Sequence, residues 1–305
     1  MTEPSTRSLL LDAARGLAVV AMVAFHLVWD LGNFGYVDPA FPFSPGVKLS
    51  GHLIAESFLF IAGVSLVLAH DRQTNWRPFW RRIAVVAGAA ALVSAGTYLV
   101  FPQAFVFFGI LHCIALASLL AAPLLSAPWS FAAAAAALAT LAPALFVSHV
   151  FNAPAFWWTG FSTFEPLTND YRPIMPWSAG LFAGVAAARL SETRDWSTPT
   201  VDRGLGPLPW LGRHSLTIYL LHQPLLFVIF TGIAALTSTQ RAENLDVYLA
   251  SCEAQCAGAG GKPDVCARTC ACTTQRATVD PPPNDPDIRA VWIDEAAREC
   301  LARTQ

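Results

Sequence analysis

The hydrophobic pattern of the chain is a series of long apolar stretches separated by short polar segments. A helix needs about 20 apolar residues to cross a bilayer, and seven stretches approach that length. They cover residues 9–31, 51–70, 83–101, 104–125, 128–148, 174–190 and 214–236. The pattern predicts an all-α fold, a polytopic transmembrane helix bundle of about seven spans, with residues 1–236 as the membrane domain.

Four ionisable residues interrupt the first apolar stretch: Asp12, Arg15, His26 and Asp30. At about 100° per residue, Arg15 and His26 lie within roughly 20° of each other around a helix, and both aspartates lie on the same side. Each charge costs about 3 kcal/mol at the middle of a bilayer. This stripe is therefore the first candidate for function.

The composition supports a membrane protein. Hydrophobic residues make up 54% of the chain and charged residues 13%, whereas about 25% of a typical soluble domain is charged. The formal charge is −2, and the sequence has no Lys- or Arg-rich run. These features exclude nucleic acid as a partner and make the lipid bilayer the expected surrounding.

The distribution of positive charge predicts the orientation of the helices. Arginines gather in two loops, at positions 72, 77, 81 and 82 and at positions 189, 194, 203 and 213. The alternate loops hold only Lys48 and Arg172. Because positive loops stay in the cytoplasm, we expect a multi-pass protein of the inner membrane with its amino terminus inside and its carboxyl terminus outside. Polar residues after the first apolar core favour an uncleaved first span over a signal peptide.

The tail, residues 237–305, holds six of the seven cysteines. Cys252 and Cys256 form one C-x-x-x-C unit, and Cys266 and Cys270 form a second, with Gly-Gly-Lys-Pro between them. Two helices folded back at this turn would bring the units together for two disulfides. Cys272 and Cys300 would supply a third, and an extracytoplasmic position favours all three. A zinc site is the alternative, although no histidine follows His222 and the spacing is unusual for zinc.

Five further runs of residues, taken in order, resemble a known family. They are Leu11-Asp12-Ala-Ala-Arg15-Gly16 with Phe25-His26, Ser57-Phe-Leu-Phe-Ile-Ala-Gly63, Phe108-Gly-Ile-Leu-His112, Asp170-Tyr171-x-Pro173-x-x-Pro176-Trp177, and Trp210-Leu-Gly-Arg213 through Tyr219, His222 and Pro224. Over residues 8–235 the chain resembles the integral-membrane acyltransferase superfamily. Within it, the chain is similar to the bacterial branch related to the catalytic domain of heparan-alpha-glucosaminide N-acetyltransferase.

The resemblance implies an acyl donor, usually acyl-CoA reached from the cytoplasm, and a carbohydrate or envelope glycan as acceptor on the outer side. An acetyl group is the expected cargo. In the lysosomal enzyme of this family, the histidine regarded as catalytic lies in the first lumenal loop. Here the corresponding stretch, 32–50, contains no histidine, and the nearest are His26 and His52.

Acyl transfer requires a base for the acceptor proton and a group that stabilises the oxyanion. His26 is the expected base because histidine titrates near neutrality. Asp30, one turn later, would orient its imidazole. Arg15 would contact the phosphates or pantetheine of acyl-CoA. Direct transfer and an acetyl-histidine intermediate both remain open.

Other polar residues complete the predicted site. Glu56 and His112 are further catalytic candidates, with helix–helix hydrogen bonding as the alternative for both. Glu56 would partner His26 or His112. Arg81, Arg82 and His222 are the further candidates for the donor site. Asp170 and Tyr171, in the longest outer loop between spans, would bind the acceptor. No metal is predicted.

Two other classes of function fit the same residues. A transporter or channel would use the intramembrane arginine, histidines and carboxylates as a proton or substrate pathway. A haem protein would use two of His26, His112 and His222 as axial ligands. The acceptor, the acyl chain length and the oligomeric state leave no mark in the sequence.

Overall fold

The computed structural model describes residues 9–38, 41–69, 76–193, 205–237, 245–258, 260–280 and 286–304. The chain divides into two units, and each is described by itself. The first unit comprises Met1–Ala24 and Gly51–Gln223, and the second comprises Phe25–Ser50 and Pro224–Gln305. Three helices, α1 (Leu9–Asn33), α2 (Pro45–Leu68) and α8 (Ser215–Thr237), contribute to both.

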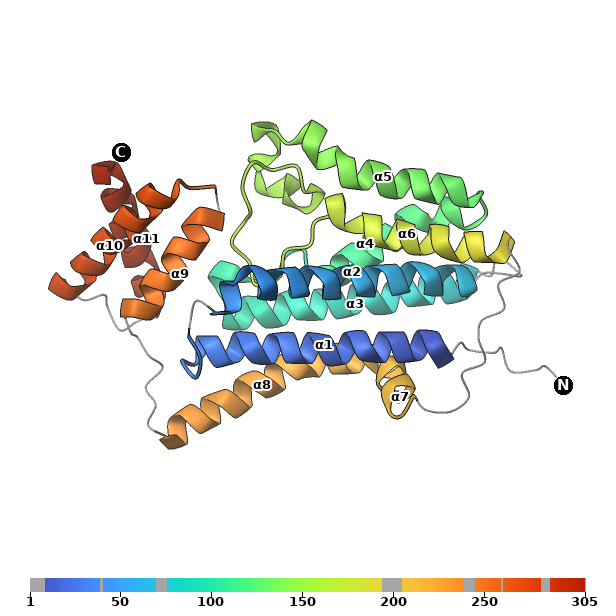
Figure 1. Ribbon diagram of the computed structural model, residues 1–305, viewed down its shortest axis with the longest axis horizontal. Helices are drawn as coiled ribbons and strands as arrows, with labels where there is room; N and C mark the ends of the chain where they lie inside the picture. Colours follow the sequence, from blue (N-terminus) through green and yellow to red (C-terminus); the bar gives the residue numbers. More distant parts are fainter. Residues whose placement is uncertain are drawn as a thin grey trace. The chain divides into compact units, whose positions relative to one another are not determined.

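The first unit is helical throughout its described core. Besides parts of the three shared helices, it contains α3 (Trp76–Val100), α4 (Ile110–Ala121), α5 (Trp129–Phe146), α6 (Ile174–Thr193) and the short α7 (Leu208–Arg213). Within it, α2 to α6 run side by side, and α5 lies along α6 (Figure 1). The prediction of an all-α membrane fold is confirmed.

Five of the described helices are long and apolar enough to cross a membrane: α1, α2, α3, α5 and the first 20 residues of α8. The two other predicted spans correspond to α4, which continues as a 3₁₀ turn to Leu125, and α6, whose last turns carry Arg189 and Glu192. The orientation prediction depends partly on Arg72, Arg194 and Arg203, which lie outside the described residues.

The core of the first unit is built where α2, α4, α5 and α6 meet. Leu59 and Leu66 of α2 are fully buried with Leu181 and Val185 of α6. The two backbones approach closely, because a Cβ at Gly63 would collide with the Leu181 carbonyl and a Cβ at Gly184 with that of Phe60. Small residues at such crossings are a common device of membrane helices.

The predicted span 104–125 is wrong at its beginning, because α4 begins only at Ile110. Residues 104–108 instead run beside the segment before α6. The Asn169 N–H donates to the Ala104 carbonyl at 2.9 Å, and the Arg172 N–H donates to the Phe108 carbonyl at 3.1 Å. Pairing with a distant segment thus satisfies backbone groups that a longer helix would have satisfied internally.

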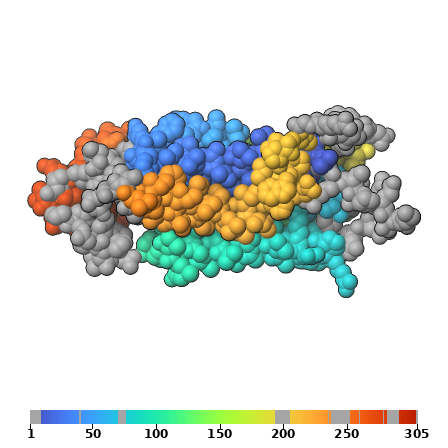
Figure 2. Space-filling model, turned by 90° about the horizontal axis from the view of Figure 1, so that it is seen from below, coloured from blue at the N-terminus to red at the C-terminus, as the bar shows by residue number. Residues whose placement is uncertain are grey.

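Helix α7 is an element that the hydrophobic pattern did not predict, because six residues are too few to show a period. It lies directly on the beginning of α1, and Figure 2 shows α7 in yellow covering the dark blue first turns. A Cβ at Gly16 would collide with the Leu208 carbonyl, and one at Gly212 with the Asp12 carbonyl. The two helices are therefore joined through reciprocal glycine contacts.

In the second unit, α1 ends where Gly35 adopts a left-handed conformation (φ 74°). The Gly35 and Tyr36 N–H groups donate to the Gly32 and Leu31 carbonyls at 3.1 and 2.8 Å. Glycine is favoured at this position after a helix because it has no Cβ. The helix end is thus encoded locally.

The tail consists of α9 (Leu245–Gly258), α10 (Pro263–Val279) and α11 (Pro286–Thr304), with α10 packed against both others (Figure 1). The predicted disulfides are present. They join Cys252 to Cys270, Cys256 to Cys266 and Cys272 to Cys300. All six tail thiols are therefore used, which leaves none for zinc. The domain boundary at residue 237 stays a prediction.

Candidate functional site

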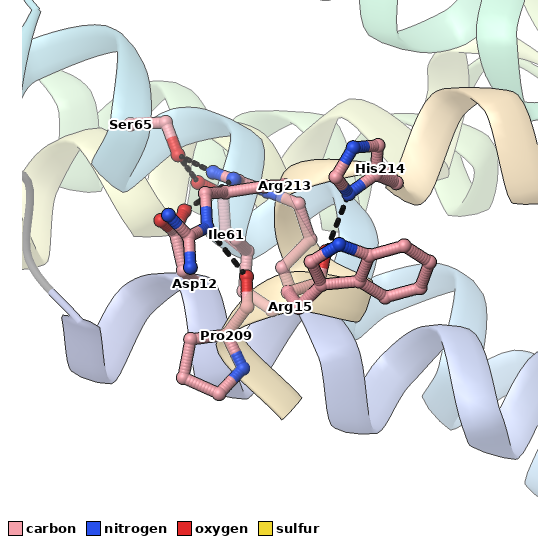
Figure 3. Close-up of polar contacts among 8 residues, drawn as sticks. Asp12, Arg15, Ile61, Ser65, Pro209, Arg213 and His214 are labelled. Atoms are coloured by element: carbon pink, nitrogen blue, oxygen red, sulfur yellow. Dashed lines mark hydrogen bonds and ion pairs between the residues drawn. The ribbon is translucent and has the colours of Figure 1, made fainter. Parts of the chain in front are cut away.

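The first polar group of the first unit, named here the arginine cluster, consists of Asp12, Arg15, Ser65 and Arg82. Arg15 Nη1 donates to Asp12 Oδ1 at 3.0 Å, and its Nη2 donates to Ser65 Oγ at 2.7 Å (Figure 3). Asp12 is only 2% exposed. The charge of Arg15 is therefore matched by a buried carboxylate within the protein.

Arg82 extends this cluster from α3. Its Nη2 donates to the Ala62 carbonyl of α2 at 3.1 Å, and it lies within electrostatic range of Arg15. From α7, the Arg213 Nε donates to the Pro209 carbonyl at 3.2 Å on the other side of the same group (Figure 3). Three elements, α1, α3 and α7, thus bring positive charge to one end of the first unit.

An open pocket of about 590 Å³ lies beside Arg82. Its wall is formed by three arginines and four apolar residues: Arg77, Arg81, Arg82, Pro78, Val85, Val86 and Leu216. Arg77 and Arg81 are exposed and pair with no acidic residue in the described ranges. Cationic groups above an apolar wall suit a ligand that carries phosphates on a long, weakly polar arm.

The second polar group, named here the carboxylate cluster, consists of Glu56, His112, Asp170 and Arg172. Asp170 lies in the segment before α6, and its Oδ2 accepts the Ile110 N–H at 2.8 Å. A carboxylate at this position stabilises the exposed N–H groups at the beginning of α4. Burial raises the pKa of Asp170 above its ordinary value, although the Arg172 guanidinium, the Ile110 N–H and His112 lower it.

His112 is bound on both sides of its ring. The Gly109 N–H donates to Nδ1 at 3.2 Å, so the ring proton lies on Nε2, which faces Ser94 Oγ at 3.2 Å. The Ser94 hydroxyl in turn donates to the Val106 carbonyl at 2.6 Å. Both ring nitrogens therefore serve the junction of α3 and α4, and neither is open to an acceptor in this arrangement.

Glu56 differs from the other members of the carboxylate cluster. It is half-buried in α2 and makes neither a hydrogen bond nor an ion pair with any residue that the structure describes. Its carboxylate lies against Gly180 of α6, where a Cβ would collide with Oε2. A carboxylate without a partner inside a membrane helix is costly and marks a functional site.

Arg172 is a cation of this cluster that the sequence did not single out as a site residue. Its Nη1 donates to the Tyr171 carbonyl at 2.7 Å, and its Nε is 3.8 Å from Asp170 Oδ1. The guanidinium carbon lies 4.5 Å from the centre of the Trp177 ring, a cation–π distance. The signal was its place between Tyr171 and Pro173 in the fourth of the recognisable runs.

The remaining predicted residues make further contacts of their own. The Tyr171 hydroxyl donates to the Trp157 carbonyl at 2.6 Å, and burial together with the charge of Glu165 raises its pKa to about 12. His222 of α8 is buried, with Nδ1 2.8 Å from the Tyr219 carbonyl. His26 and Asp30 lie on the part of α1 that belongs to the second unit. There Asp30 is 2% exposed, and the His26 ring meets Phe25 edge-on.

Comparison with known protein families explains this arrangement. Residues 7–224 match the family model described as "Heparan-alpha-glucosaminide N-acetyltransferase, catalytic", which is more than half of the chain. The chain belongs to this family. No curated protein and no solved structure matches the chain significantly.

Membership of the heparan-alpha-glucosaminide N-acetyltransferase family makes the protein a membrane acetyltransferase rather than a transporter. The family uses acetyl-CoA as donor. The match includes the arginine cluster, the pocket and the carboxylate cluster, but it ends within α8 and excludes the tail. The disulfide-linked helices are therefore an addition to the catalytic region.

Proposed function

We propose that the protein transfers an acetyl group from cytoplasmic acetyl-CoA to a hydroxyl or amine of a carbohydrate or envelope glycan on the outer face of the inner membrane. The observation that carries this proposal is the separation of two unlike polar groups along α2, the one helix that they share. Ser65 and Glu56 are nine residues apart on α2, roughly 14 Å by helical rise. The family supplies the chemistry, and the two clusters supply a donor end and an acceptor end.

The proposed membrane arrangement has seven crossings. In it, α4 with its 3₁₀ extension and α6 cross beside the five longer helices, and the amino terminus is cytoplasmic. The arginine cluster and its pocket then face the cytoplasm, in agreement with the positive-inside rule. The tail, outside, lies where disulfides persist.

The donor site is the pocket lined by Arg77, Arg81 and Arg82. Guanidinium groups bind phosphate oxygens well, and Val85, Val86 and Leu216 provide an apolar wall for the pantetheine arm. The residues present therefore fit acetyl-CoA. Arg15 is hydrogen-bonded to Asp12 and Ser65, so it would stabilise the inner end of the donor site rather than bind a phosphate.

For the chemical step we propose His26 as general base. It would take the proton from the acceptor hydroxyl or amine while the acceptor atom attacks the acetyl carbonyl. The carbon–sulfur bond then breaks, and the CoA thiolate takes up a proton. Asp30, four residues later on α1, would orient the imidazole. An acetyl-histidine intermediate is the alternative route from the same residue.

On the acceptor side we propose that Glu56 contacts the acceptor. Asp170, through the Ile110 N–H, and His112, through Gly109 and Ser94, hold the beginning of α4 in place. Tyr171 anchors the segment before α6 through its hydroxyl. These contacts support a rigid wall around the Glu56 carboxylate, which has no hydrogen-bond or ion-pair partner among the described residues.

The test uses purified protein in detergent, acetyl-CoA, and methyl α-glucosaminide as a probe that offers both an amine and hydroxyls. Release of the CoA thiol and the mass of the acetylated probe are measured. We expect His26→Ala to abolish transfer and His149→Ala, at an exposed histidine beside Asn152, to leave it unchanged. Absence of transfer by the wild-type protein would refute the proposed function, and normal turnover by His26→Ala would refute the base.

A further inference from the structure

The slot that holds Glu56 is formed by a glycine. A Cβ at Gly180 would meet Glu56 Oε2 first and the Glu56 carboxyl carbon at 3.2 Å, whereas the nearest other atom is Leu59 Cβ at 3.2 Å. The glycines at 63 and 184 differ, because a Cβ there would strike backbone atoms of the opposite helix. Gly180 therefore leaves room for a carboxylate rather than for a helix crossing.

The charge that faces this carboxylate is Arg172. It acts electrostatically on both Glu56 and Asp170. Its guanidinium is held by the Tyr171 carbonyl and the Trp177 ring, and its side chain is 20% exposed. A fixed cation of this kind keeps little conformational freedom, so it provides a directed field.

The two carboxylates near Arg172 are used differently. Asp170 accepts the Ile110 N–H and lies 3.8 Å from the Arg172 Nε, so its oxygens serve the fold. Glu56 is within the field of Arg172 but makes no ion pair in the described ranges. Its oxygens are therefore the ones left for a ligand that donates hydrogen bonds.

From these contacts we propose that Gly180 and Arg172 are positioning residues for Glu56. Gly180 provides the space and Arg172 the charge that keep the carboxylate where it accepts a hydrogen bond from the acceptor amine or hydroxyl. This assignment rests on the proposed acetyl transfer. It predicts that both residues affect the acceptor and not acetyl-CoA.

The first experiment is a double-mutant cycle between Gly180→Ala and Glu56→Ala. The new methyl group displaces the carboxylate, so we expect kcat/KM for methyl α-glucosaminide to fall about 10-fold, with KM for acetyl-CoA unchanged. In the Glu56→Ala background, Gly180→Ala should not lower kcat/KM any further. Gly88→Ala is the matched control, because a Cβ there meets nothing within 4 Å. A loss of equal size in both backgrounds would show a packing role and overturn the proposal.

The second experiment compares Arg172→Gln with Arg172→Lys. We expect Arg172→Gln to lower kcat/KM for the acceptor about 10-fold, and Arg172→Lys to recover part of that loss, since it keeps the positive charge but not the planar guanidinium. Arg268→Gln, in the tail, is the matched control. Arg172→Lys could lose as much kcat/KM as Arg172→Gln, with both variants unfolding at a lower temperature than the wild type. In that case Arg172 only stabilises the loop, and the proposal is wrong.

The proposed function and the positioning roles of Gly180 and Arg172 can fail separately. If the wild-type protein releases no CoA in the presence of the acceptor, both the proposed function and the positioning roles are wrong. A wild-type protein that transfers acetyl, with Gly180→Ala and Arg172→Gln equal to it, removes only the positioning roles.

Discussion

The arginine cluster and the carboxylate cluster of the first unit share helix α2 but treat charge in opposite ways. In the arginine cluster, Arg15 is matched by Asp12 and Ser65, and Arg82 by a carbonyl of α2. In the carboxylate cluster, Asp170 is matched, but Glu56 is not paired with any described residue.

This difference shows which polar residues serve the fold and which are left for a ligand. A buried pair costs desolvation but is satisfied by its partner, whereas an unmatched charge has no such compensation. The part of the charged stripe of α1 that lies within the first unit forms an ion pair between Arg15 and Asp12. The carboxylate cluster contains Glu56 of α2, which forms no ion pair with a residue that the structure describes.

The largest expected effect tests the matched side of the comparison. Arg15→Ala leaves the buried Asp12 without its arginine, which we expect to cost about 3 kcal/mol of unfolding free energy. Thermal unfolding in detergent measures the change. Asp12→Ala with Arg15→Ala together should recover part of the loss. Full stability of Arg15→Ala would mean that the pair does not hold α1.

The next effect tests the unmatched side. Glu56→Gln keeps the shape but removes the charge, so a charge-assisted hydrogen bond to the acceptor is lost, worth about 2.7 kcal/mol or 100-fold in kcat/KM. Transfer to methyl α-glucosaminide measures the loss. The unfolding temperature should not fall, since no described partner is left behind. A Glu56→Gln variant that is less stable but fully active would show that Glu56 stabilises the fold and does not contact the acceptor.

A smaller effect sharpens the assignment of the donor end. The double variant Arg77→Ala/Arg81→Ala removes two exposed cations from the pocket, so we expect KM for acetyl-CoA to rise about 10-fold and to depend less on salt. KM for the acceptor should stay the same. Arg268→Ala/Arg298→Ala, which removes two exposed arginines from the tail, is the control. Equal donor KM values in both double variants would contradict the donor site.

The smallest effect concerns pH. Because burial raises the pKa of Asp170, the folded protein binds this proton more tightly than the unfolded chain. Between about pH 4 and the raised pKa of Asp170, this carboxyl therefore makes the folded protein less stable as pH rises. Asp170→Asn removes this pH-dependent destabilisation. The melting temperature of the variant relative to that of the wild type should therefore increase as pH rises through this range. A constant difference would show that Asp170 does not titrate there.

The five long apolar helices follow from the sequence because apolar length alone predicts membrane spans. The segment 104–109 does not follow, since its backbone partners, Asn169 and Arg172, are some 60 residues away. The disulfides could be grouped in advance because C-x-x-x-C spacing places both thiols of a unit on one helix face. Distant backbone pairing leaves no comparable periodic signal.

The candidate site was only partly predictable for a related reason. Residue type marked Glu56 and His112, since ionisable groups are rare in apolar stretches, whereas Asp170 was marked by the recognisable run in the outer loop. The sequence could not show that His112 is bound at both nitrogens, or that Gly180 faces Glu56, because those facts depend on which helices meet.

The three disulfides leave Cys113, which is buried in α4, as the one free thiol among the seven cysteines. The native protein should thus be silent to a thiol reagent that cannot pass through lipid. A single cysteine placed in the loop after α2 or in the tail would then report, by labelling of intact cells against opened ones, which compartment each segment occupies.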